Sequence, residues 1–263
     1  MRIAFRILYL GTAFFGSQIQ PDLRTVEGEF IEACRRLDLF EDWKAAALVF
    51  AGRTDRGVHA RGQVCAFTTD RPERAIALLN VQLPRDCQAA GYCEVPEGFH
   101  PRFDAVSRTY RYYWTDQFPE RAHMDRVARM FQGEHDFSSF ARIEAGHDPV
   151  RCVFSSHVFS EGDYTVFEIT AASFLWNMVR CMASALESVG TGNSGEERIL
   201  HLLQERCPRP AATPAEGLVL WNVDCGIDFL PLSPAPRSRA YFDEMWRYHR
   251  RMDRISRIVA GQE

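Results

Sequence analysis

The chain has 263 residues, of which 46% are hydrophobic and 25% are charged, and its formal net charge is −4. These values are ordinary for a soluble globular protein and exclude a disordered or collagen-like chain. The length is sufficient for one large domain or two of ordinary size. The net charge alone does not indicate a nucleic-acid partner, although a negative total can conceal a basic face.

The cations are almost all of one kind. Lys44 is the only lysine, and every other residue among the 31 Lys and Arg is an arginine. The planar guanidinium suits phosphates and the edges of bases. A bias in the genome explains the same usage without reference to function, so composition leaves both explanations open.

Eight cysteines are scattered through the chain, and none forms a C-x-x-C pair. Neither a zinc ribbon nor a redox motif is therefore expected, and nothing in the sequence demands a metal or an organic cofactor. No signal peptide is recognisable, and no apolar stretch is long enough to cross a bilayer. We expect a reduced, cytoplasmic protein that does not enter a membrane.

The first part of the chain reads strand, helix, strand, strand, helix, strand. The expected elements are Arg2–Tyr9, a helix capped by Thr25, the apolar run 45–51, the strand 63–69, a helix that opens at Pro72, and the strand 88–95. This alternation predicts a mixed α+β arrangement. We assign it to an N-terminal subdomain of residues 1–98.

The pattern restarts after Pro101 and gives a second subdomain, residues 99–225. The expected elements are the strand 107–115, the helix 122–132, a hairpin of 150–160 and 164–172, the helices 174–189 and 196–206, and the strand 217–223. The two parts share a rough element order. We therefore predict two similar α/β subdomains whose sheets join edge to edge into one extended sheet.

The composition changes in the extension that we assign to residues 226–263. After two prolines, the segment 237–257 is a candidate helix that mixes seven arginines with aromatic residues. Basic and aromatic side chains together suit a phosphate backbone and exposed bases. A helix that docks on the body with solvated arginines explains the same pattern, so both interpretations stay open.

The most informative stretch is the polar loop 51–60 between two predicted strands. It begins a cluster of Arg53, Asp55, Arg56, His59 and Arg61, in which Asp55 is the only carboxylate. Nearby positive charge favours the ionised form of an acid. An ionised Asp55 suits the role of a nucleophile or a base. A solvated hairpin tip with charges is the competing interpretation.

Two further stretches carry candidate residues. In the strand 107–115, alternation places Arg108, Tyr110 and Tyr112 on one face, where a tyrosine between cations can stack on a base. In the helix 174–189, Arg180 lies at the edge of the apolar stripe. A half-buried arginine requires a carboxylate partner, for which Asp55 is a candidate, and a surface position is the alternative.

Five blocks of the sequence, in order, resemble the tRNA pseudouridine synthase A family. The central loop matches the family signature G-R-T-D-x-G-V-H-A. The other four blocks are 16–20, 99–112, 174–180 and 213–218. The resemblance spans roughly residues 2–225, and an ordered set of this kind is highly specific.

The resemblance implies the pseudouridine synthase fold, with helices on the outer face of the extended sheet, and a cofactor-free isomerisation of uridine in tRNA. Asp55 matches the catalytic aspartate, Tyr110 the active-site tyrosine and Arg180 the arginine that pairs with the aspartate. Arg53 matches a loop arginine implicated in opening out the target base. Leu218 matches an apolar residue near the site.

The same blocks supply the residues that we expect to contact RNA, which are Arg53, Arg56, His59, Arg61, Arg102, Arg108 and Leu218. The default targets of the family are positions 38 to 40 of the anticodon arm, and relatives modify other sites in tRNA. The family is homodimeric, with RNA bridging both subunits. We therefore expect a homodimer whose partner is tRNA.

Some residues depart from the family pattern. Arg56 stands where many members have alanine, and Leu10 and Ser17 stand where bacterial members commonly have aspartate and tryptophan. These departures concern the target position rather than the chemistry. Two other classes compete with the isomerase: a non-catalytic RNA chaperone that kept the fold, and a metal-dependent nucleic-acid hydrolase using Asp55, His59 and His100.

Overall fold

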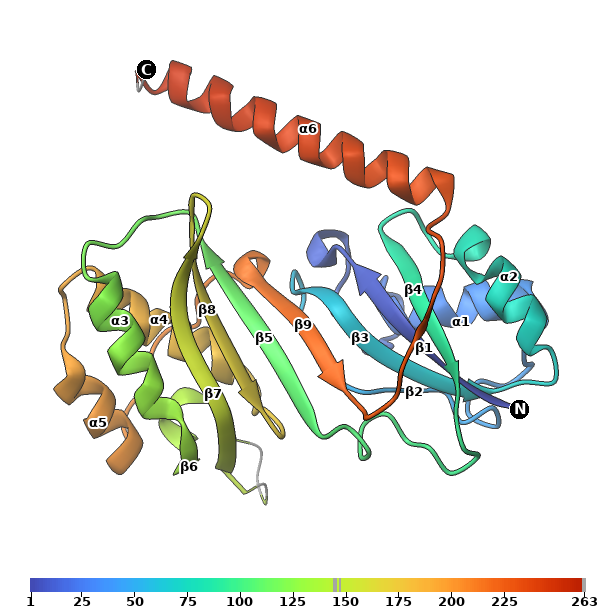
Figure 1. Cartoon of the computed structure of the whole chain (residues 1–263), viewed down its shortest axis with the longest axis horizontal. Coiled ribbons are helices and arrows are strands. Elements are labelled where there is room, and N and C mark those ends of the chain that lie inside the picture. Colours follow the sequence, from blue (N-terminus) through green and yellow to red (C-terminus); the bar gives the residue numbers. More distant parts are fainter. Residues whose placement is uncertain (144–145, 147, 262–263) are drawn as a thin grey trace.

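The computed structural model describes residues 1–143, 146 and 148–261 (Figure 1). Its central feature is a mixed sheet of ten strands in the order β10-β4-β1-β3-β9-β5-β8-β7-β6, with β2 beside β3. The strands are β1 (Arg2–Tyr9), β2 (Val49–Phe50), β3 (His59–Thr68), β4 (Cys87–Glu94), β5 (Ser107–Trp114), β6 (Gly133–Asp136), β7 (Val150–Glu161), β8 (Tyr164–Ala171), β9 (Leu218–Asp224) and β10 (Leu230–Pro231).

The helices form two groups at the two ends of the sheet, with one helix set apart (Figure 1). They are α1 (Val26–Arg36), α2 (Pro72–Gln82), α3 (Arg121–Ala128), α4 (Met178–Gly190), α5 (Glu196–Gln204) and α6 (Pro236–Val259). This architecture confirms the predicted α+β class with a single extended sheet.

Strand β9 joins the two parts of the sheet. It pairs with β5 in an antiparallel arrangement and with β3 in a parallel one. The parallel contact consists of His59 opposite Val219 and Ala60 opposite Leu220. All other strand pairings in the described part of the chain are antiparallel. The two parts therefore meet edge to edge through a strand that comes late in the sequence.

Local signals in the sequence explain several element boundaries. Thr25 caps α1, because its hydroxyl oxygen accepts a hydrogen bond from the N–H of Gly28. Pro72 lies in the first turn of α2, where a missing N–H breaks no helical hydrogen bond. The predicted hairpin of β7 and β8 turns at Gly162, which has a φ of +61°.

Two predicted elements are shorter than the apolar pattern indicates. The run 45–51 contributes only the two residues of β2, because turns precede it and Ala47 has a φ of +48°. The helix predicted from residue 174 begins at Met178, because Asn177 has a φ of +63°. A left-handed residue cannot continue an α-helix, so 174–177 is a separate, non-helical segment.

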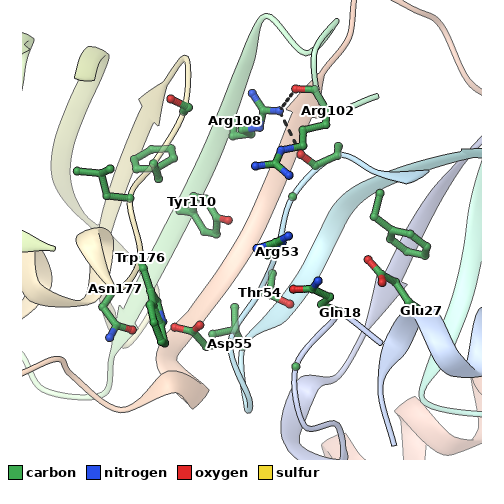
Figure 2. Close-up of a pocket in the computed structure, with 18 of the residues that line it drawn as sticks. Gln18, Glu27, Arg53, Thr54, Asp55, Arg102, Arg108, Tyr110, Trp176 and Asn177 are labelled. Atoms are coloured by element: carbon green, nitrogen blue, oxygen red, sulfur yellow. Dashed lines mark hydrogen bonds between the residues drawn. The ribbon is translucent and has the colours of Figure 1, made fainter. Parts of the chain in front are cut away.

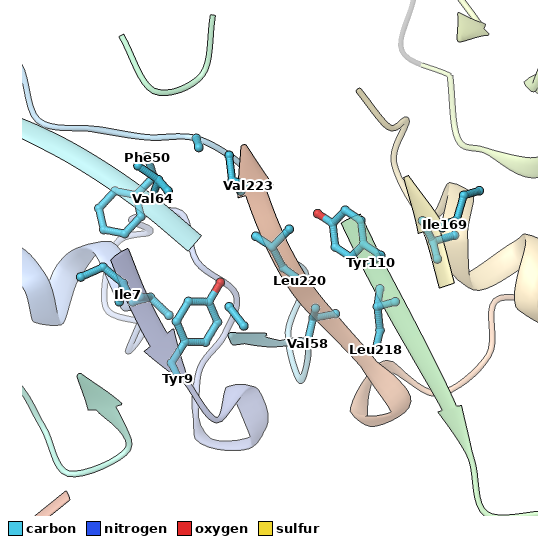
Figure 3. Packing of buried hydrophobic residues seen from close by; sticks show 14 of the residues in the cluster. Ile7, Tyr9, Phe50, Val58, Val64, Tyr110, Ile169, Leu218, Leu220 and Val223 are labelled. Atoms are coloured by element: carbon cyan, nitrogen blue, oxygen red, sulfur yellow. The ribbon is translucent and has the colours of Figure 1, made fainter. Parts of the chain in front are cut away.

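The hydrophobic core is continuous across the junction of the two parts. Figure 3 shows Leu220 of β9 between side chains of β1 and β3, including Tyr9 and Val64, and Tyr110 of β5. Leu220 and Val64 are fully buried. A fully buried aliphatic side chain contributes about 1.5–3 kcal/mol relative to an exposed one. The junction is therefore a packed core and not a hinge between separate cores.

Helix α6 stands apart from the sheet (Figure 1). Its presence confirms the helix predicted over 237–257, and only Ser238 within it is buried. None of the helices in the described residues is both long and apolar enough to span a membrane.

Candidate active site

The loop between β2 and β3 carries Asp55, and hydrogen bonds hold this loop from both sides. On one side, the Gln63 side chain exchanges hydrogen bonds with the backbone of Gly52, at 2.8 and 3.2 Å. On the other side, the Ser17 hydroxyl accepts the N–H of Thr54 at 2.8 Å, and the Ser17 N–H donates to the Thr54 carbonyl at 3.0 Å. The backbone beside Asp55 is therefore fixed.

Close backbone approach explains one of the glycines near this loop. Gly16 has a φ of +95°, and a Cβ at this position would lie 3.0 Å from the carbonyl oxygen of Thr54. A side chain here would be strained in conformation and crowded by the loop. Gly16 thus lets the segment with Ser17 reach the catalytic loop.

A cavity of about 1000 Å³ opens beside Asp55. It collects residues from the loops after β1 and β2, from strands β5 and β9, and from the start of α4 (Figure 2). The residues predicted from the sequence that line it are Arg53, Asp55, Arg56, Arg102, Arg108, Tyr110, Arg180 and Leu218. The fold therefore brings together all three predicted catalytic residues, which come from distant parts of the chain.

Asp55 and Arg180 form an ion pair inside this cavity. The distance between Arg180 Nη1 and Asp55 Oδ2 is 3.6 Å, and the two side chains are 18% and 35% exposed, respectively. Arg180 is held in turn by the Thr213 carbonyl oxygen, which accepts from its Nε at 2.7 Å. The pairing predicted between these two residues is confirmed, and the alternative of a surface arginine is wrong.

The charge state of Asp55 is more finely balanced than the sequence indicates. Burial raises the pKa of Asp55 above its usual value, although the Arg180 charge and the Trp176 indole oppose this shift. The arginines adjacent in sequence, Arg53 and Arg56, are exposed. The sequence indicates that nearby positive charge favours the ionised form of Asp55, and the structure adds burial of the side chain as the larger and opposite effect on its pKa.

Tyr110 shares one face of β5 with Arg108 and Tyr112, as the alternation predicts, and the structure shows that this face is buried. Its ring packs edge to face against Phe174, with 5.1 Å between ring centroids. Burial raises the pKa of Tyr110 to about 12, and the negative charge of Asp55 acts in the same direction while Arg108 opposes it. The hydroxyl is therefore protonated at neutral pH. Figure 2 shows that it points into the cavity on the side of Arg53.

Arg108 lines the cavity, but its guanidinium binds backbone. Its side-chain N–H groups donate to the carbonyl oxygens of Arg102 at 2.6 Å, Ala172 at 2.7 Å and Ala51 at 3.1 Å. Residue Ala51 belongs to the N-terminal part of the sheet, whereas Ala172 belongs to the C-terminal part. Arg108 is 9% exposed and ties the two parts together at the wall of the cavity, and the exposed Arg102 lies beside it (Figure 2).

His59 and Arg61 do not line the cavity. His59 Nδ1 accepts the N–H of Gly11 at 3.0 Å, and its Nε2 lies 3.1 Å from the Glu216 carbonyl oxygen. Because Nδ1 accepts a hydrogen bond, the ring proton lies on Nε2 and the ring is neutral. Burial lowers the pKa of His59, which agrees with a neutral ring. Arg61 stacks on Trp221 at 4.5 Å. His59 thus contacts the segment just before β9, and Arg61 contacts β9 itself.

Two residues close to Asp55 and Arg180 were missed in the sequence. Trp176 is 44% exposed and lies beside Asp55 (Figure 2). Arg142 stacks on the ring of Trp176 at 4.5 Å. A backbone hydrogen bond from Arg142 to the Trp176 carbonyl, at 3.0 Å, fixes the segment. Asn177 accepts from Arg180 Nη1 at 3.5 Å while its backbone is left-handed. Helical spacing hid both, because the apolar stripe of 174–189 skips these positions.

The rim of the cavity adds an aromatic and a cation from opposite sides. Arg56 stacks on the exposed ring of Phe15, with 4.4 Å to the ring centroid. Arg53 is exposed and projects into the cavity (Figure 2). Glu27 closes the far end, where it accepts the N–H of Ile19 at 3.0 Å. Burial raises the pKa of Glu27, and the Ile19 N–H and the Arg53 charge oppose the shift.

Within the described residues, no three His, Cys, Asp or Glu side chains come together in a way that could hold a metal ion. The three residues of the hydrolase alternative are not gathered at one point. His59 is engaged with Gly11 and Glu216, and His100 stacks on Phe103 with 4.3 Å between ring centroids.

Comparison with known proteins places this chain in a family. The profile of the family described as tRNA pseudouridine synthase matches residues 6–104 and 127–224. The "tRNA pseudouridine synthase A" of Methanoculleus marisnigri is 53% identical over 263 residues, covering 99% of this chain and 96% of that protein. The protein of the same name from Methanosphaerula palustris is 53% identical over 240 residues, covering 91% and 85%.

More distant relatives keep the similarity. The "tRNA pseudouridine synthase A" of Thermococcus sibiricus is 47% identical over 226 residues, covering 85% of this chain and 84% of that protein. The match to a solved structure, "Crystal Structure of a Cbf5-Nop10-Gar1 Complex", covers 69% of this chain and 54% of that chain at 14% identity, with a TM-score of 0.33. The family profile and these relatives show that the chain belongs to the tRNA pseudouridine synthase family, whose enzymes isomerise uridine to pseudouridine.

Proposed function

We propose that this enzyme isomerises uridine to pseudouridine in the anticodon arm of tRNA, with positions 38 to 40 as the first candidates and Asp55 as the catalytic group. The observation that carries the proposal is the placement of Asp55 in a large cavity, 3.6 Å from Arg180, with Tyr110 lining the same cavity. The same chemistry at another position of tRNA is the second candidate, because Arg56, which lines the cavity, stands where many members have alanine.

A uridine in a stem reaches this cavity only after it leaves the stack, which costs a few kcal/mol. Arg53 projects into the cavity and can occupy the vacated space or bind a phosphate. Trp176 offers an exposed aromatic face beside Asp55. Stacking of a base on an aromatic side chain contributes about 1–3 kcal/mol, which is enough to offset much of that cost.

The chemical step requires ionised Asp55. As a nucleophile, the carboxylate attacks carbon 6 of the base or the anomeric carbon of the sugar; as a base, it removes a sugar proton and gives a glycal. In each route the bond from the sugar to N1 breaks, the base turns, and a bond from the sugar to carbon 5 forms. The bond to Asp55 breaks again in the nucleophilic routes, and in the glycal route Asp55 returns the sugar proton. The proton on carbon 5 is then lost and N1 gains one, so the reaction exchanges no atoms with a cofactor.

Tyr110 is our candidate for the group that accepts the proton from carbon 5. A hydroxyl whose pKa is about 12 is not a free base at neutral pH. It accepts that proton only while it passes its own to Asp55 or to water. We expect Tyr110→Phe to bind tRNA normally and to fail in completing the reaction, and normal turnover would remove this role from the hydroxyl.

The target is tested by mapping pseudouridine in unmodified tRNA transcripts after incubation with the purified enzyme. Reverse transcription after carbodiimide treatment locates each product. We expect stops at positions 38 to 40. Stops only at other positions would support the second candidate, and an absence of product would favour the RNA chaperone.

Asp55→Asn tests the chemistry separately from the target. The substitution keeps the shape of the side chain and removes its charge, so we expect kcat to fall by at least about 10⁴-fold, as for other catalytic nucleophiles. The Kd for tRNA should stay within about twofold of wild type, since a single charge contributes little when others remain. Asp70→Asn, at a side chain that is 85% exposed, is the matched control.

Two arms of that experiment separate the competing classes. A chaperone would show no difference between Asp55→Asn and Asp70→Asn. A metal-dependent hydrolase would lose activity in a strong chelator, whereas the isomerase should keep full activity there.

The assembly belongs to the same proposal. The resemblance implies a homodimer that binds tRNA across both subunits, and the division into residues 1–98, 99–225 and 226–263 describes its parts. The loop between β4 and β5 supports a boundary near residue 98, because no strand or helix crosses it. Phosphate contacts to Arg53, Arg56 and Arg102, which are all exposed, would make tRNA binding weaken steeply with salt.

A further inference from the structure

Helix α6 carries a narrow apolar stripe with heptad spacing. Its members are separated alternately by four and three residues, and they are Tyr241, Met245, Tyr248, Met252, Ile255 and Val259. This alternation places them at successive a and d positions, on one line along the helix. A stripe of this kind is the seam of a coiled coil rather than the broader face of a helix that packs on a globular core.

The body of the protein covers only the beginning of this stripe. Ser238 is buried, and the Arg85 guanidinium lies over the ring of Tyr241 at 4.7 Å. From residue 246 to residue 261, every residue is exposed. Tyr248 is 46% exposed and Val259 is 83% exposed. In the described chain, two-thirds of the seam therefore lies against solvent, as Figure 1 shows for the far end of α6.

The charges beside the stripe indicate which partner fits it. Glu244 and Arg251 both occupy the g position, one heptad apart. In an antiparallel pair of identical helices, g positions face g positions, so Glu244 lies opposite the partner's Arg251, and the contact occurs twice. In a parallel pair, g positions face e positions, so Glu244 would face the partner's His249 and Arg251 would face the partner's Ser256.

We propose that α6 pairs with α6 of a second copy of this chain in an antiparallel coiled coil. In the register that the charges select, Met245 packs against the partner's Tyr248, and Tyr241 packs against the partner's Met252. The arginines on the opposite face of α6 point away from this seam, namely Arg247, Arg250, Arg254 and Arg257. The inference rests on the homodimer proposed above, for which it names a contact, and it is independent of the proposed target and chemistry.

RNA is the other partner that α6 suggests, because of those arginines. The seam argues for protein instead. Met252, Ile255 and Val259 offer neither charge nor aromatic faces, which are the groups that bind phosphates and stack on bases. Two such seams, however, cover one another's apolar surface.

Self-association of the full chain, measured by sedimentation velocity over a concentration series, tests the proposal. We expect the double variant Met252→Glu/Ile255→Glu to weaken self-association by at least about tenfold, as for hot-spot side chains at interfaces. Trp246→Glu is the matched control, because it places the same acid on an exposed residue outside the seam. Its self-association should be that of the wild type. Thermal unfolding should be unchanged in both, since every residue from 246 to 261 is exposed.

Charge reversal tests the orientation. Glu244→Arg and Arg251→Glu should each weaken self-association, and the double variant Glu244→Arg/Arg251→Glu should restore it, because the antiparallel contact is rebuilt with its signs exchanged. A double variant no stronger than the single ones would overturn the antiparallel register. A wild type that stays monomeric, or a seam variant that associates like the wild type, would overturn the pairing itself. If that seam variant also bound tRNA more weakly, the seam would be an RNA surface.

Discussion

At the scale of a single residue, opposing effects act on the ionisation of the Asp55 carboxyl group. Burial in the cavity disfavours its charge, and Arg180 and Trp176 favour it. Because the pKa in the folded protein is raised, ionisation of Asp55 costs folding stability as the pH rises through the pKa of the unfolded chain. The enzyme thus keeps a carboxylate that destabilises the fold at neutral pH, and Asp55→Asn should unfold at the same or a higher temperature than the wild type.

The pH dependence of activity should report this balance. Activity requires the carboxylate, so it falls as the pH drops through the pKa of Asp55. Arg180→Met removes the positive charge and should move this acid limb to higher pH, with a lower kcat. Arg180→Lys keeps a charge and should leave the limb near that of the wild type. Single-turnover rates measured from acid to neutral pH check both variants, and an identical limb in Arg180→Met would contradict the coupling.

Trp176 should affect both the ionisation of Asp55 and the binding of tRNA, and two substitutions separate these effects. Trp176→Phe keeps an aromatic face and loses the indole N–H, so we expect the acid limb to move to higher pH with little change in the Kd for tRNA. Trp176→Ala loses both and should weaken tRNA binding by about tenfold, the lower range for one stacked base. Equal Kd values for Trp176→Ala and the wild type would show that the exposed ring does not contact RNA.

At the scale of elements, the catalytic loop depends on its anchors as much as on its own sequence. Ser17→Ala would leave the buried N–H of Thr54 without its acceptor, which costs about 1–3 kcal/mol. We expect a lower midpoint of unfolding in urea and a reduced kcat, since the loop beside Asp55 loosens. Ser160→Ala, at an exposed serine of β7, is the control and should match the wild type in both measurements.

Residue types and spacing predicted most of the strands and the capped helix α1, whereas spacing left the position of Arg180 open and the family resemblance implied its pairing with Asp55. They did not predict that α4 starts at Met178, because the left-handed Asn177 interrupts a pattern that reads as helical from residue 174. They also did not show that Arg108 would bind backbone carbonyls or that His59 would lie outside the cavity. Those outcomes depend on which strands become neighbours, and this information is absent from local periodicity.

At the scale of the whole molecule, the reactivity of the cysteine thiols shows whether the hydrophobic core is closed to solvent. Cys34, Cys65 and Cys87 are buried, and burial raises the pKa of each thiol. Iodoacetamide should leave these three unmodified in the native enzyme, since the thiolate is the reactive form, while Cys93 and Cys207 are less buried. Peptide mass spectrometry before and after unfolding in urea checks this, and native modification of Cys65 would indicate local opening of β3.

The position of β9 has a consequence for synthesis on the ribosome. The strand lies between β3 and β5, but it is among the last strands translated, at residues 218–224. A nascent chain that has not yet released it holds β5 with an unpaired edge along residues 107–112. Free edges of this kind recruit other extended chains. The two parts of the sheet therefore cannot join during synthesis until β9 has emerged from the ribosome. A ribosome that stalls shortly before codon 218 would leave a truncated chain that is prone to aggregate.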